Sequence, residues 1–532
     1  MTSLTGKNSI AGQWSAQGDE TFTSVDPRTK QPGDVQFHNA TKAEIDHAVN
    51  EAAAAFQETR HYPASKLADF LDTAAEEIEK LREELVETAD YETGLGSPRL
   101  PGELTRTTSQ LKAFASLLRE GSYVDAIIDT AMPDRQPAPR PDLRRMLIPI
   151  GPVAVFSASN FPFAFATAGG DTASAFAAGC PVIVKGHPGH PATTELFTVA
   201  LNNAVKACDF PAGFFSMVQG NGVEVGQNLV QHPLLEAVGF TGSLRGGRAL
   251  YDSAAQRPRP IPVYAEMGSV NPFVIMPGAI EARGDSLVDT LVGSATLGAG
   301  QFCTNPGLVL ILESDATQDF IQRYTAAMQA KQPEVMLNAS IESGLARAVE
   351  QTVGAGGVDL LTGGEVVDGG GFCYAHTVMQ TNSTTFRSNP KLHEEHFGPV
   401  TLFITCPTLD DLRLTLNTLE GQLTGTIQAE ADEVEAARPV AEALRERVGR
   451  LIWNGVPTGV EVVYSQQHGG PYPATTAPGT TSVGMTAIKR FMRPLAYQSI
   501  PSPLLPDALK DENPLGILRI VNNEYTREPI QS

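Results

Sequence analysis

Pro181-Val182-Ile183-Val184-Lys185-Gly186-His187-Pro188 joins a short continuous apolar run to a polar turn. Such a run, bounded by turn residues, is typical of a strand that is buried on both faces of a sheet. Helix-length segments lie on either side of it, at residues 165–178 and about 193–207. Similar apolar runs recur at residues 153–156, 215–218 and 237–240, and another helix is expected from about residue 243. Continuous apolar strands that alternate with helices predict an α/β fold with a parallel sheet covered on both faces.

Two amphipathic segments precede this alternation. Thr41-Lys42-Ala43-Glu44 has the pattern of a capping box at the start of a helix. A second helix is expected from about Ser65, because apolar residues recur there at helical spacing. Both segments predict packing helices without a chemical role.

Composition limits the class of protein. A chain of 532 residues is too long for one compact core, so two or three domains are expected. Lys plus Arg number 39 against 60 Asp plus Glu, and the net charge of −21 argues against non-specific binding of nucleic acid. Neither a bilayer-spanning apolar run nor an N-terminal export signal is found in the sequence. We therefore expect a cytoplasmic protein with no membrane partner.

The cysteines indicate reduced thiols. Their number is odd and none of them forms a CxxC pair, which argues against a disulfide framework and against a metal site. The five are Cys180, Cys208, Cys303, Cys373 and Cys406. Cys303 differs from the rest because it lies in Gly298-Ala299-Gly300-Gln301-Phe302-Cys303-Thr304-Asn305-Pro306-Gly307, where glycines let a ligand approach the backbone. It is a candidate nucleophile, and the alternative is a small buried apolar side chain.

Polar residues follow three of the expected strands. Asn160 comes shortly after the run at 153–156, Lys185 ends the run at 182–184, and Thr241-Gly242-Ser243 follows the run at 237–240. Ligands of parallel sheets bind beyond the carboxyl ends of the strands, and a helix N-terminus such as that near Ser243 can hold a phosphate. The alternatives are a turn-stabilising amide, a solvated lysine and an ordinary helix cap. Because the sequence has no GxGxxG motif, a standard Rossmann mode of binding is disfavoured.

The sequence resembles the aldehyde dehydrogenase superfamily over essentially its whole length. Six separated motifs stand in that family's order: Ser159-Asn160-Phe161-Pro162, Val184-Lys185, Phe240-Thr241-Gly242-Ser243, Ala265-Glu266-Met267-Gly268, Gly300-Gln301-Phe302-Cys303 and Glu394-Glu395-His396-Phe397-Gly398-Pro399-Val400. Three further stretches are similar to the branch of bacterial α-ketoglutaric semialdehyde (2,5-dioxovalerate) dehydrogenases: Pro141–Met146, Ala168–Ala175 and Arg493–Gln498.

The resemblance implies two parallel-sheet α/β domains and a small β flap that mediates oligomerisation. We expect a cofactor domain over residues 1–268, with flap strands near residues 140–150. A catalytic domain that carries Cys303 would cover 269–480, and a C-terminal return segment with the rest of the flap 481–532. Pairing of flap edges between subunits would give a homodimer or homotetramer.

Three residues receive catalytic roles from the resemblance. Cys303 would attack the aldehyde as a thiolate, Asn160 would donate to the developing oxyanion, and Glu266 would deprotonate the water that hydrolyses the thioester. Apolar neighbours such as Met267 are expected to raise the pKa of Glu266. The alternative for Glu266 is a structural salt bridge.

The same resemblance assigns cofactor contacts. Lys185 would bind the adenosine ribose, Ser243 and Gly242 the pyrophosphate, and Glu395 and Phe397 the nicotinamide half, with Ser159, Phe240 and Thr241 also lining the cofactor site. Many NAD-dependent relatives carry a glutamate three residues after the lysine, where this chain has Pro188. NADP is therefore the expected cofactor and NAD remains possible. His187 would help to hold the phosphate, or would simply be exposed.

The substrate residues are less clear. A semialdehyde with a distal carboxylate needs a cation, for which Arg144 or Arg145 are candidates, although an interface salt bridge is the alternative. Phe161 and His468 would shape the pocket, and His468 would either assist proton transfer or be structural. Ser159 stands where many relatives carry tryptophan, which predicts a differently shaped substrate tunnel.

We therefore expect NAD(P)-dependent oxidation of an aldehyde through a Cys303 thioester, with α-ketoglutaric semialdehyde converted to 2-oxoglutarate. Three alternatives remain: a dehydrogenase of medium- or long-chain aldehydes, an acylating enzyme that transfers the thioester to coenzyme A, and a catalytically silent homologue. The presence of Glu266 disfavours the acylating enzyme.

Overall fold

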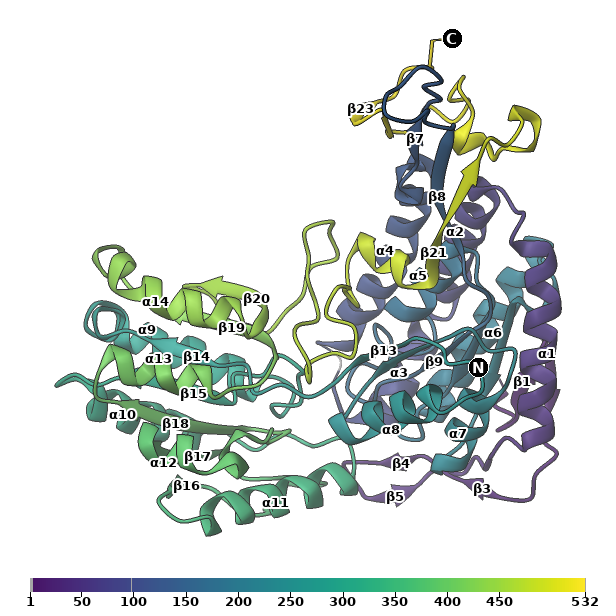
Figure 1. The fold of residues 1–532 in the computed structure, drawn as a ribbon. Coiled ribbons are helices and arrows are strands. Elements are labelled where there is room, and N and C mark those ends of the chain that lie inside the picture. Colours follow the sequence, from purple (N-terminus) through teal and green to yellow (C-terminus); the bar gives the residue numbers. More distant parts are fainter. Residues whose placement is uncertain (1–2, 97, 532) are drawn as a thin grey trace.

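The computed structural model describes residues 3–96 and 98–531, and three large sheets dominate it (Figure 1). The first sheet has the strand order β13-β12-β9-β10-β11-β1-β2. Five of its strands are parallel: β9 (Val153–Phe156), β10 (Val182–Lys185), β11 (Phe215–Val218), β12 (Ala237–Thr241) and β13 (Val263–Glu266). Strands β1 (Asn8–Ile10) and β2 (Gln13–Ser15) extend one edge in antiparallel orientation. The predicted parallel sheet is confirmed.

Helices cover both faces of this sheet. One face carries α2 (Ala64–Lys80), α3 (Arg82–Thr93), α4 (Leu100–Glu120), α5 (Gly170–Ala178) and α6 (Pro191–Ala207). The other face carries α1 (Lys42–Thr59), α7 (Val223–Gln231) and α8 (Leu244–Ala255). The predicted capping box is present, since Thr41 and Glu44 hydrogen-bond reciprocally at the start of α1. Alternate strand residues pack on opposite faces, as Val182 and Ile183 do.

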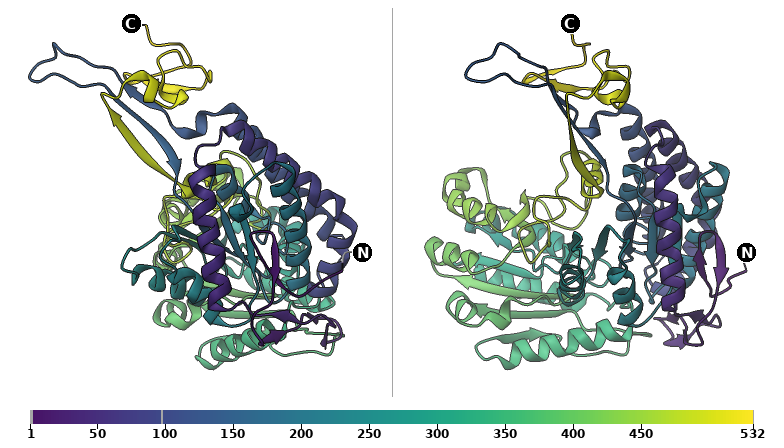
Figure 2. Two further views of the ribbon diagram at one scale, coloured as in Figure 1. Left: turned by 90° about the vertical axis from the view of Figure 1, so that its right-hand side faces the viewer. Right: turned by 45° about the vertical axis from the view of Figure 1, so that its right-hand side comes forward.

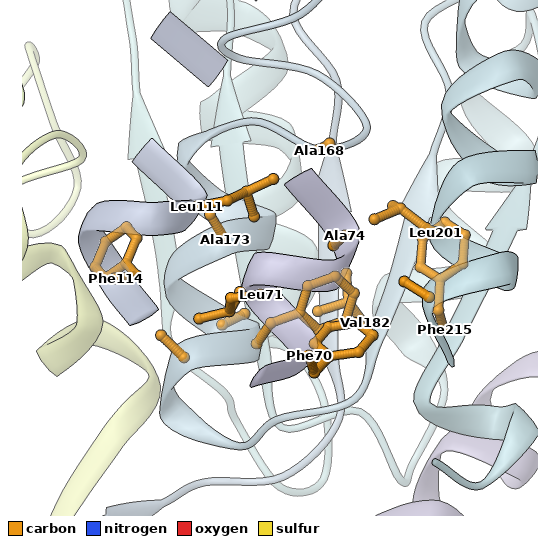
Figure 3. Packing of buried hydrophobic residues seen from close by; sticks show 14 of the residues in the cluster. Phe70, Leu71, Ala74, Leu111, Phe114, Ala168, Ala173, Val182, Leu201 and Phe215 are labelled. Atoms are coloured by element: carbon orange, nitrogen blue, oxygen red, sulfur yellow. The ribbon is translucent and has the colours of Figure 1, made fainter. Parts of the chain in front are cut away.

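Aromatic side chains fill the core between α2 and the sheet. The ring of Phe70 lies 5.1 Å from that of Phe176, 4.9 Å from that of Phe210 and 5.2 Å from that of Phe214. Figure 3 shows Phe70 and Leu71 packed close to Val182. Burial of one such ring contributes roughly 1.5–3 kcal/mol, so this cluster fixes the helices on the sheet.

The helix expected from residue 165 begins later than predicted. Helix α5 starts at Gly170, and residues 161–169 form a loop without helix or strand. The backbone N–H groups of Phe163 and Ala164 donate to Oε1 of Glu103 in α4, at 2.9 and 3.0 Å. The loop is thereby held over the carboxyl end of β9, which is where it can meet a ligand.

The second sheet has the order β16-β17-β18-β15-β14-β19-β20. Its parallel strands are β14 (Phe273–Ile275), β15 (Leu308–Leu312), β17 (Thr377–Asn382), β18 (Val400–Cys406), β19 (Gln422–Gln428) and β20 (Val448–Trp453), and β16 (Asp359–Thr362) is an antiparallel edge. Its helices are α9 (Pro277–Thr296), α10 (Thr317–Ala330), α11 (Ala339–Gly354), α12 (Ser383–Ser388), α13 (Leu409–Asn417) and α14 (Val434–Arg445). In Figure 1 this unit lies beside the first sheet, in green.

A third sheet of order β21-β8-β7-β22-β23 projects from the body (Figure 2). It contains β7 (Ile127–Asp129), β8 (Leu143–Pro149), β21 (Met492–Gln498), β22 (Arg519–Val521) and β23 (Glu524–Thr526). Strands β8 and β21 pair from Leu143↔Gln498 to Pro149↔Met492. Two small hairpins near the N-terminus pair β3 (Thr21–Phe22) with β6 (Phe37–His38) and β4 (Val25–Asp26) with β5 (Gln31–Pro32). The domain limits at residues 268 and 480 remain predictions.

No helix within the described ranges has both the length and the apolar character that crossing a membrane requires.

Candidate active site

Three ionisable side chains meet between the first and second sheets. Glu266 is the last residue of β13, Cys303 lies in the loop after α9, and His468 lies in the long segment after β20. Nε2 of His468 is 3.6 Å from Sγ of Cys303 and 2.9 Å from Oε1 of Glu266. The hydroxyl of Ser482 donates to Oε2 of Glu266 at 2.6 Å. The predicted residues Cys303, Glu266 and His468 are therefore brought together, and their thiol, carboxylate and imidazole atoms all lie within 4.8 Å of one another.

The loop that carries Cys303 is fixed by its backbone. Nδ2 of Asn271 donates to the carbonyl oxygens of Cys303 and Asn305, at 2.8 and 2.9 Å. Gly300 has a φ of +69°, and a Cβ there would lie 2.3 Å from the backbone of Gly398. Only glycine meets both requirements, so the glycines around the thiol serve close backbone packing.

Asn160 lies beside the same loop. Its Nδ2 donates to the backbone carbonyl oxygen of Gln301 at 2.9 Å. The backbone carbonyl oxygen of Asn160 accepts a hydrogen bond from Arg99. An amide side chain carries two N–H donors. One is used to anchor the loop, and the other remains available to an oxygen atom bound near Cys303.

The thiol is protonated in this environment. Burial, together with the negative charges of Glu266 and Glu395, raises the pKa of Cys303 well above its usual value, and Arg106 opposes the shift. Since only the thiolate is a strong nucleophile, a base must take the proton when an aldehyde is bound.

The pKa of Glu266 is shifted in the opposite direction to the one expected from its apolar sequence neighbours. Burial raises its pKa, but the charge of His468 and hydrogen bonds from His468, Ser482 and Cys303 outweigh burial, and the net pKa is lowered. The expectation that Met267 would raise this pKa is wrong, because the groups that contact the carboxylate are distant in sequence. Glu266 is therefore ionised at neutral pH.

A cavity of about 520 Å³ opens beside the thiol. Its walls include almost every residue that the sequence assigned to a cofactor, together with the three catalytic candidates: Ser159, Asn160, His187, Phe240, Thr241, Gly242, Ser243, Glu266, Cys303, Glu395 and Phe397. The volume suits an extended ligand such as a dinucleotide.

The start of α8 fits a phosphate. Ser243 is the N-cap of α8 and its side chain accepts from the N–H of Gly246 at 3.2 Å. A Cβ on Gly242 or Gly246 would lie 2.7 or 3.1 Å from the ring of Phe240, so glycine keeps the backbone N–H groups approachable. A helix N-terminus with free N–H groups favours an anion.

His187 lines the cavity, and Lys185, two residues earlier at the end of β10, does not. Burial lowers the pKa of Lys185 to about 8, and its Nζ donates to the carbonyl oxygen of Gly220. Burial also lowers the pKa of His187 well below its usual value, with further contributions from the charges of His190 and Lys185. Because the N–H of Gly189 donates to Nδ1 of His187, its proton lies on Nε2. His187 can thus offer an N–H donor to a ligand, without a charge.

The sequence assigned Glu395 to the nicotinamide half of the cofactor, and its side chain is a titratable carboxyl group in the cavity wall. Burial raises its pKa to about 7, with a partly opposing hydrogen bond from the backbone of Ser269. Phe397 lines the same end of the cavity.

Arg144 and Arg145 are not brought to the thiol. Arg144 lies in β8 of the projecting sheet, where it contacts Asp142 at 2.8 Å and Asp511 at 2.7 Å. Arg145 is exposed on the same strand. Both ion pairs of Arg144 lie within one chain, so the alternative of a salt bridge at a subunit interface stays a prediction. Phe161, in contrast, does reach the site, since its ring lies 5.0 Å from that of Phe302, next to Cys303.

Sequence reasoning missed several residues around the thiol. Ser482 gave no local signal, because it lies in a segment without helix or strand. Arg99, Glu103 and Arg106 were overlooked although their spacing places three charges on one face of α4. Charges on the packed face of a helix are unusual, and this pattern was the available signal.

Comparison with known proteins agrees with this geometry. Residues 14–474 match the model of the aldehyde dehydrogenase family. The chain is 44% identical over 530 residues to alpha-ketoglutaric semialdehyde dehydrogenase of Acinetobacter baylyi, which covers 99% of this chain and 100% of that protein. It is 45% identical over 522 residues to alpha-ketoglutaric semialdehyde dehydrogenase 2 of Azospirillum brasilense, covering 97% and 98%.

Solved structures show the same fold. A 1-pyrroline-5-carboxylate dehydrogenase from Thermus with bound NAD superposes with a TM-score of 0.78 at 23% identity, covering 92% of each chain. A betaine aldehyde dehydrogenase from Staphylococcus aureus superposes with a TM-score of 0.80 at 20% identity, covering 94% of this chain and 98% of that one. The predicted fold class is confirmed.

Proposed function

This chain belongs to the aldehyde dehydrogenase family, and from that premise we propose that it oxidises α-ketoglutaric semialdehyde to 2-oxoglutarate with NADP. The family match supports NAD(P)-dependent oxidation of a small-molecule aldehyde, and the names of the two relatives support the substrate. The single observation that carries the chemistry is the contact of His468 with both Cys303 and Glu266 at the edge of the 520 Å³ cavity.

Cys303 is the nucleophile in this proposal. Ionised Glu266, which contacts the thiol, takes its proton as Sγ attacks the aldehyde carbon, and Nε2 of His468 holds the carboxylate in place. Because its pKa is raised, the partly buried thiol stays protonated and reacts only slowly until a substrate is present. When bound, the dinucleotide supplies the acceptor for the hydride that leaves the thiohemiacetal carbon.

Asn160 stabilises the oxyanion of the thiohemiacetal. The N–H of its side chain that is not bonded to Gln301 points to this role, with the backbone N–H of Cys303 as the partner donor. Removal of one such donor typically costs about 3–4 kcal/mol in the transition state.

Glu266 then serves hydrolysis of the thioester. A carboxylate with a lowered pKa is ionised and can accept a proton from water, either directly or through His468. Its presence also disfavours transfer of the acyl group to coenzyme A, which needs no base for water.

The cofactor residues follow the walls of the cavity. Gly242 and Ser243 would hold the pyrophosphate at the start of α8 and Glu395 the nicotinamide ribose. Lys185, at the end of β10 beside the cavity residue His187, would hold the adenosine ribose. Pro188 leaves the position after His187 without a carboxylate, so nothing there repels a 2′-phosphate. The Nε2–H of His187 adds a donor for that phosphate, which supports NADP over NAD.

The projecting sheet supports a homodimer or homotetramer. Large apolar side chains are exposed there: Tyr525 of β23 is 74% accessible, and Leu504, in the segment that joins β21 to β22, is 72% accessible. Apolar patches of this kind mark interfaces, and light scattering on the purified protein measures the subunit number.

An initial-rate panel tests the function. α-Ketoglutaric semialdehyde, succinic semialdehyde and medium-chain alkanals are compared with NADP and NAD. We expect the highest kcat/KM for α-ketoglutaric semialdehyde with NADP. The aromatic rings of Phe161, Phe165 and Phe302 near the thiol favour a second candidate, oxidation of medium-chain aldehydes. A much higher kcat/KM for unsubstituted alkanals would establish that second candidate instead.

A further inference from the structure

One cation near the thiol has no partner among the described residues. Arg106 lies on α4, and its guanidinium lies over the ring of Phe165 at 5.3 Å. That ring is 6.0 Å from the ring of His468, whose Nε2 is 3.6 Å from Sγ of Cys303. Arg106 is thus separated from the nucleophile by two ring side chains, on the side formed by α4 and the 161–169 loop.

The arginines in the described part of the chain differ in how their charges are satisfied. Those with neither a hydrogen bond nor an ion pair are otherwise exposed on the surface, namely Arg145, Arg245, Arg347, Arg445 and Arg493. Arg106 lacks such a partner although it is half-buried. A charge that is partly removed from water without a partner is costly, so this site is built to receive an anion.

The other arginines near the thiol, Arg99 and Arg450, do have partners. Arg99 donates to the carbonyl oxygen of Asn160 and lies 3.5 Å from Glu103. Arg450 donates to the carbonyl oxygens of Pro457 and Gly459. Both therefore hold loops in place, and neither has its full set of donors free for a ligand.

The acidic groups around Arg106 leave room for a carboxylate. Glu103 is engaged by the backbone of Phe163 and Ala164 as well as by Arg99, and Glu461 is exposed to solvent. Neither lies within ion-pair distance of Arg106. The cation also acts at the thiol, because its charge opposes the rise in the pKa of Cys303.

We propose that Arg106 binds the distal carboxylate of an aldehyde whose carbonyl carbon lies at Sγ of Cys303, an inference that rests on the proposed function. A guanidinium presents a planar fork of donors that matches a carboxylate. A short aliphatic chain between aldehyde and carboxylate would lie along the rings of Phe161 and Phe165. An uncharged alkanal would leave the cation unpaired, which selects against it.

The test compares Arg106→Gln with the matched surface variant Arg445→Gln. For Arg106→Gln we expect kcat/KM for α-ketoglutaric semialdehyde to fall about 10- to 100-fold, mainly through KM, because a charge-assisted contact is lost. Pentanal, which has a similar carbon chain and no carboxylate, should change by less than about threefold. Arg106→Lys, which keeps the charge but not the fork, should lie in between, and Arg445→Gln should match the wild type for both aldehydes.

A second readout does not need turnover. Glutarate, an unreactive dicarboxylate, should slow alkylation of Cys303 by iodoacetamide in the wild type, followed by intact-mass spectrometry. This protection should disappear in Arg106→Gln and persist in Arg445→Gln. Melting temperatures of all variants show whether the fold is kept, and Arg106→Lys serves if Arg106→Gln does not fold.

The outcomes separate this inference from the proposed function. An equal fall for semialdehyde and pentanal, or protection by glutarate that survives in Arg106→Gln, would overturn the role of Arg106. A wild-type preference for pentanal would instead overturn the substrate. In that case glutarate protection that depends on Arg106 still identifies it as a carboxylate site.

Discussion

The two walls on either side of Cys303 are built in different ways. The cofactor wall comes largely from the ends of parallel strands, such as β12 with Thr241 and the turn after β10 with His187. The opposite wall combines α4, the 161–169 loop and the segment after β20 that carries His468. The sheet fixes the shape of a wall made from strand ends, so that wall suits one kind of ligand. A wall made from loops can change with its ligand, which explains how one fold serves several aldehydes.

The substitution with the largest expected effect removes the thiol of Cys303, which both walls share. Cys303→Ala should abolish turnover by at least about 10⁴-fold, because no other thiol lies at the site. Binding of NADPH, measured by fluorescence, should be retained, since the cofactor wall is independent of the sulfur. Joint loss of turnover and cofactor binding would show that Cys303 supports the fold of both walls.

His468→Asn tests the loop-built wall. We expect kcat to fall about 10²- to 10⁴-fold, since the imidazole that keeps Glu266 ionised beside the thiol is lost. The pKa of Glu266 should rise, because burial raises it and the opposing charge is gone. The acidic limb of the pH–rate profile should therefore move to higher pH. The exposed histidine variant His47→Asn is the control and should leave the profile unchanged; an unaltered profile in His468→Asn would remove the histidine from the proton path.

Pro188→Glu tests the strand-built wall alone. A carboxylate placed after His187 repels a 2′-phosphate, so the ratio of kcat/KM for NADP to that for NAD should fall about 10- to 100-fold. Pro188→Gln has a similar shape without the charge and should change the ratio much less. The substrate KM should stay the same in both variants, and a change there would mean that the two walls are coupled.

Ser482→Ala has the smallest expected effect. It removes the hydrogen bond that helps to lower the pKa of Glu266, so that pKa should rise and activity below neutral pH should fall about 10-fold. Ser482→Thr keeps the hydroxyl and should restore the profile. A pH profile that is identical in Ser482→Ala and the wild type would show that the ion pair with His468 alone sets the charge of Glu266.

The sequence predicts residues at strand ends better than residues in the loop-built wall. Lys185 and Ser243 could be assigned because each follows an apolar run, and parallel strands end at one edge of a sheet. Glu266 was assigned from its motif alone. The contact of His468 with Glu266 could not be predicted, because no periodicity links β13 with a segment that lies beyond β20. The pKa of Glu266 was misjudged for this reason, since Met267 is its neighbour only along the chain. Arg144 and Arg145 were named as candidate cations because they lie in a motif, and Arg106 was not considered, since the partner of a charge is decided in three dimensions.

The reactive centre is assembled across a seam, with the carboxylate on the first sheet, the thiol on the second and the imidazole on the chain that returns between them. Any hinge motion that opened the seam by a few ångströms would separate the thiol from the carboxylate. The sulfur would then lose its proton acceptor, and its rate of alkylation would change. The rate at which Cys303 is alkylated therefore reports how tightly the two halves of the molecule are closed.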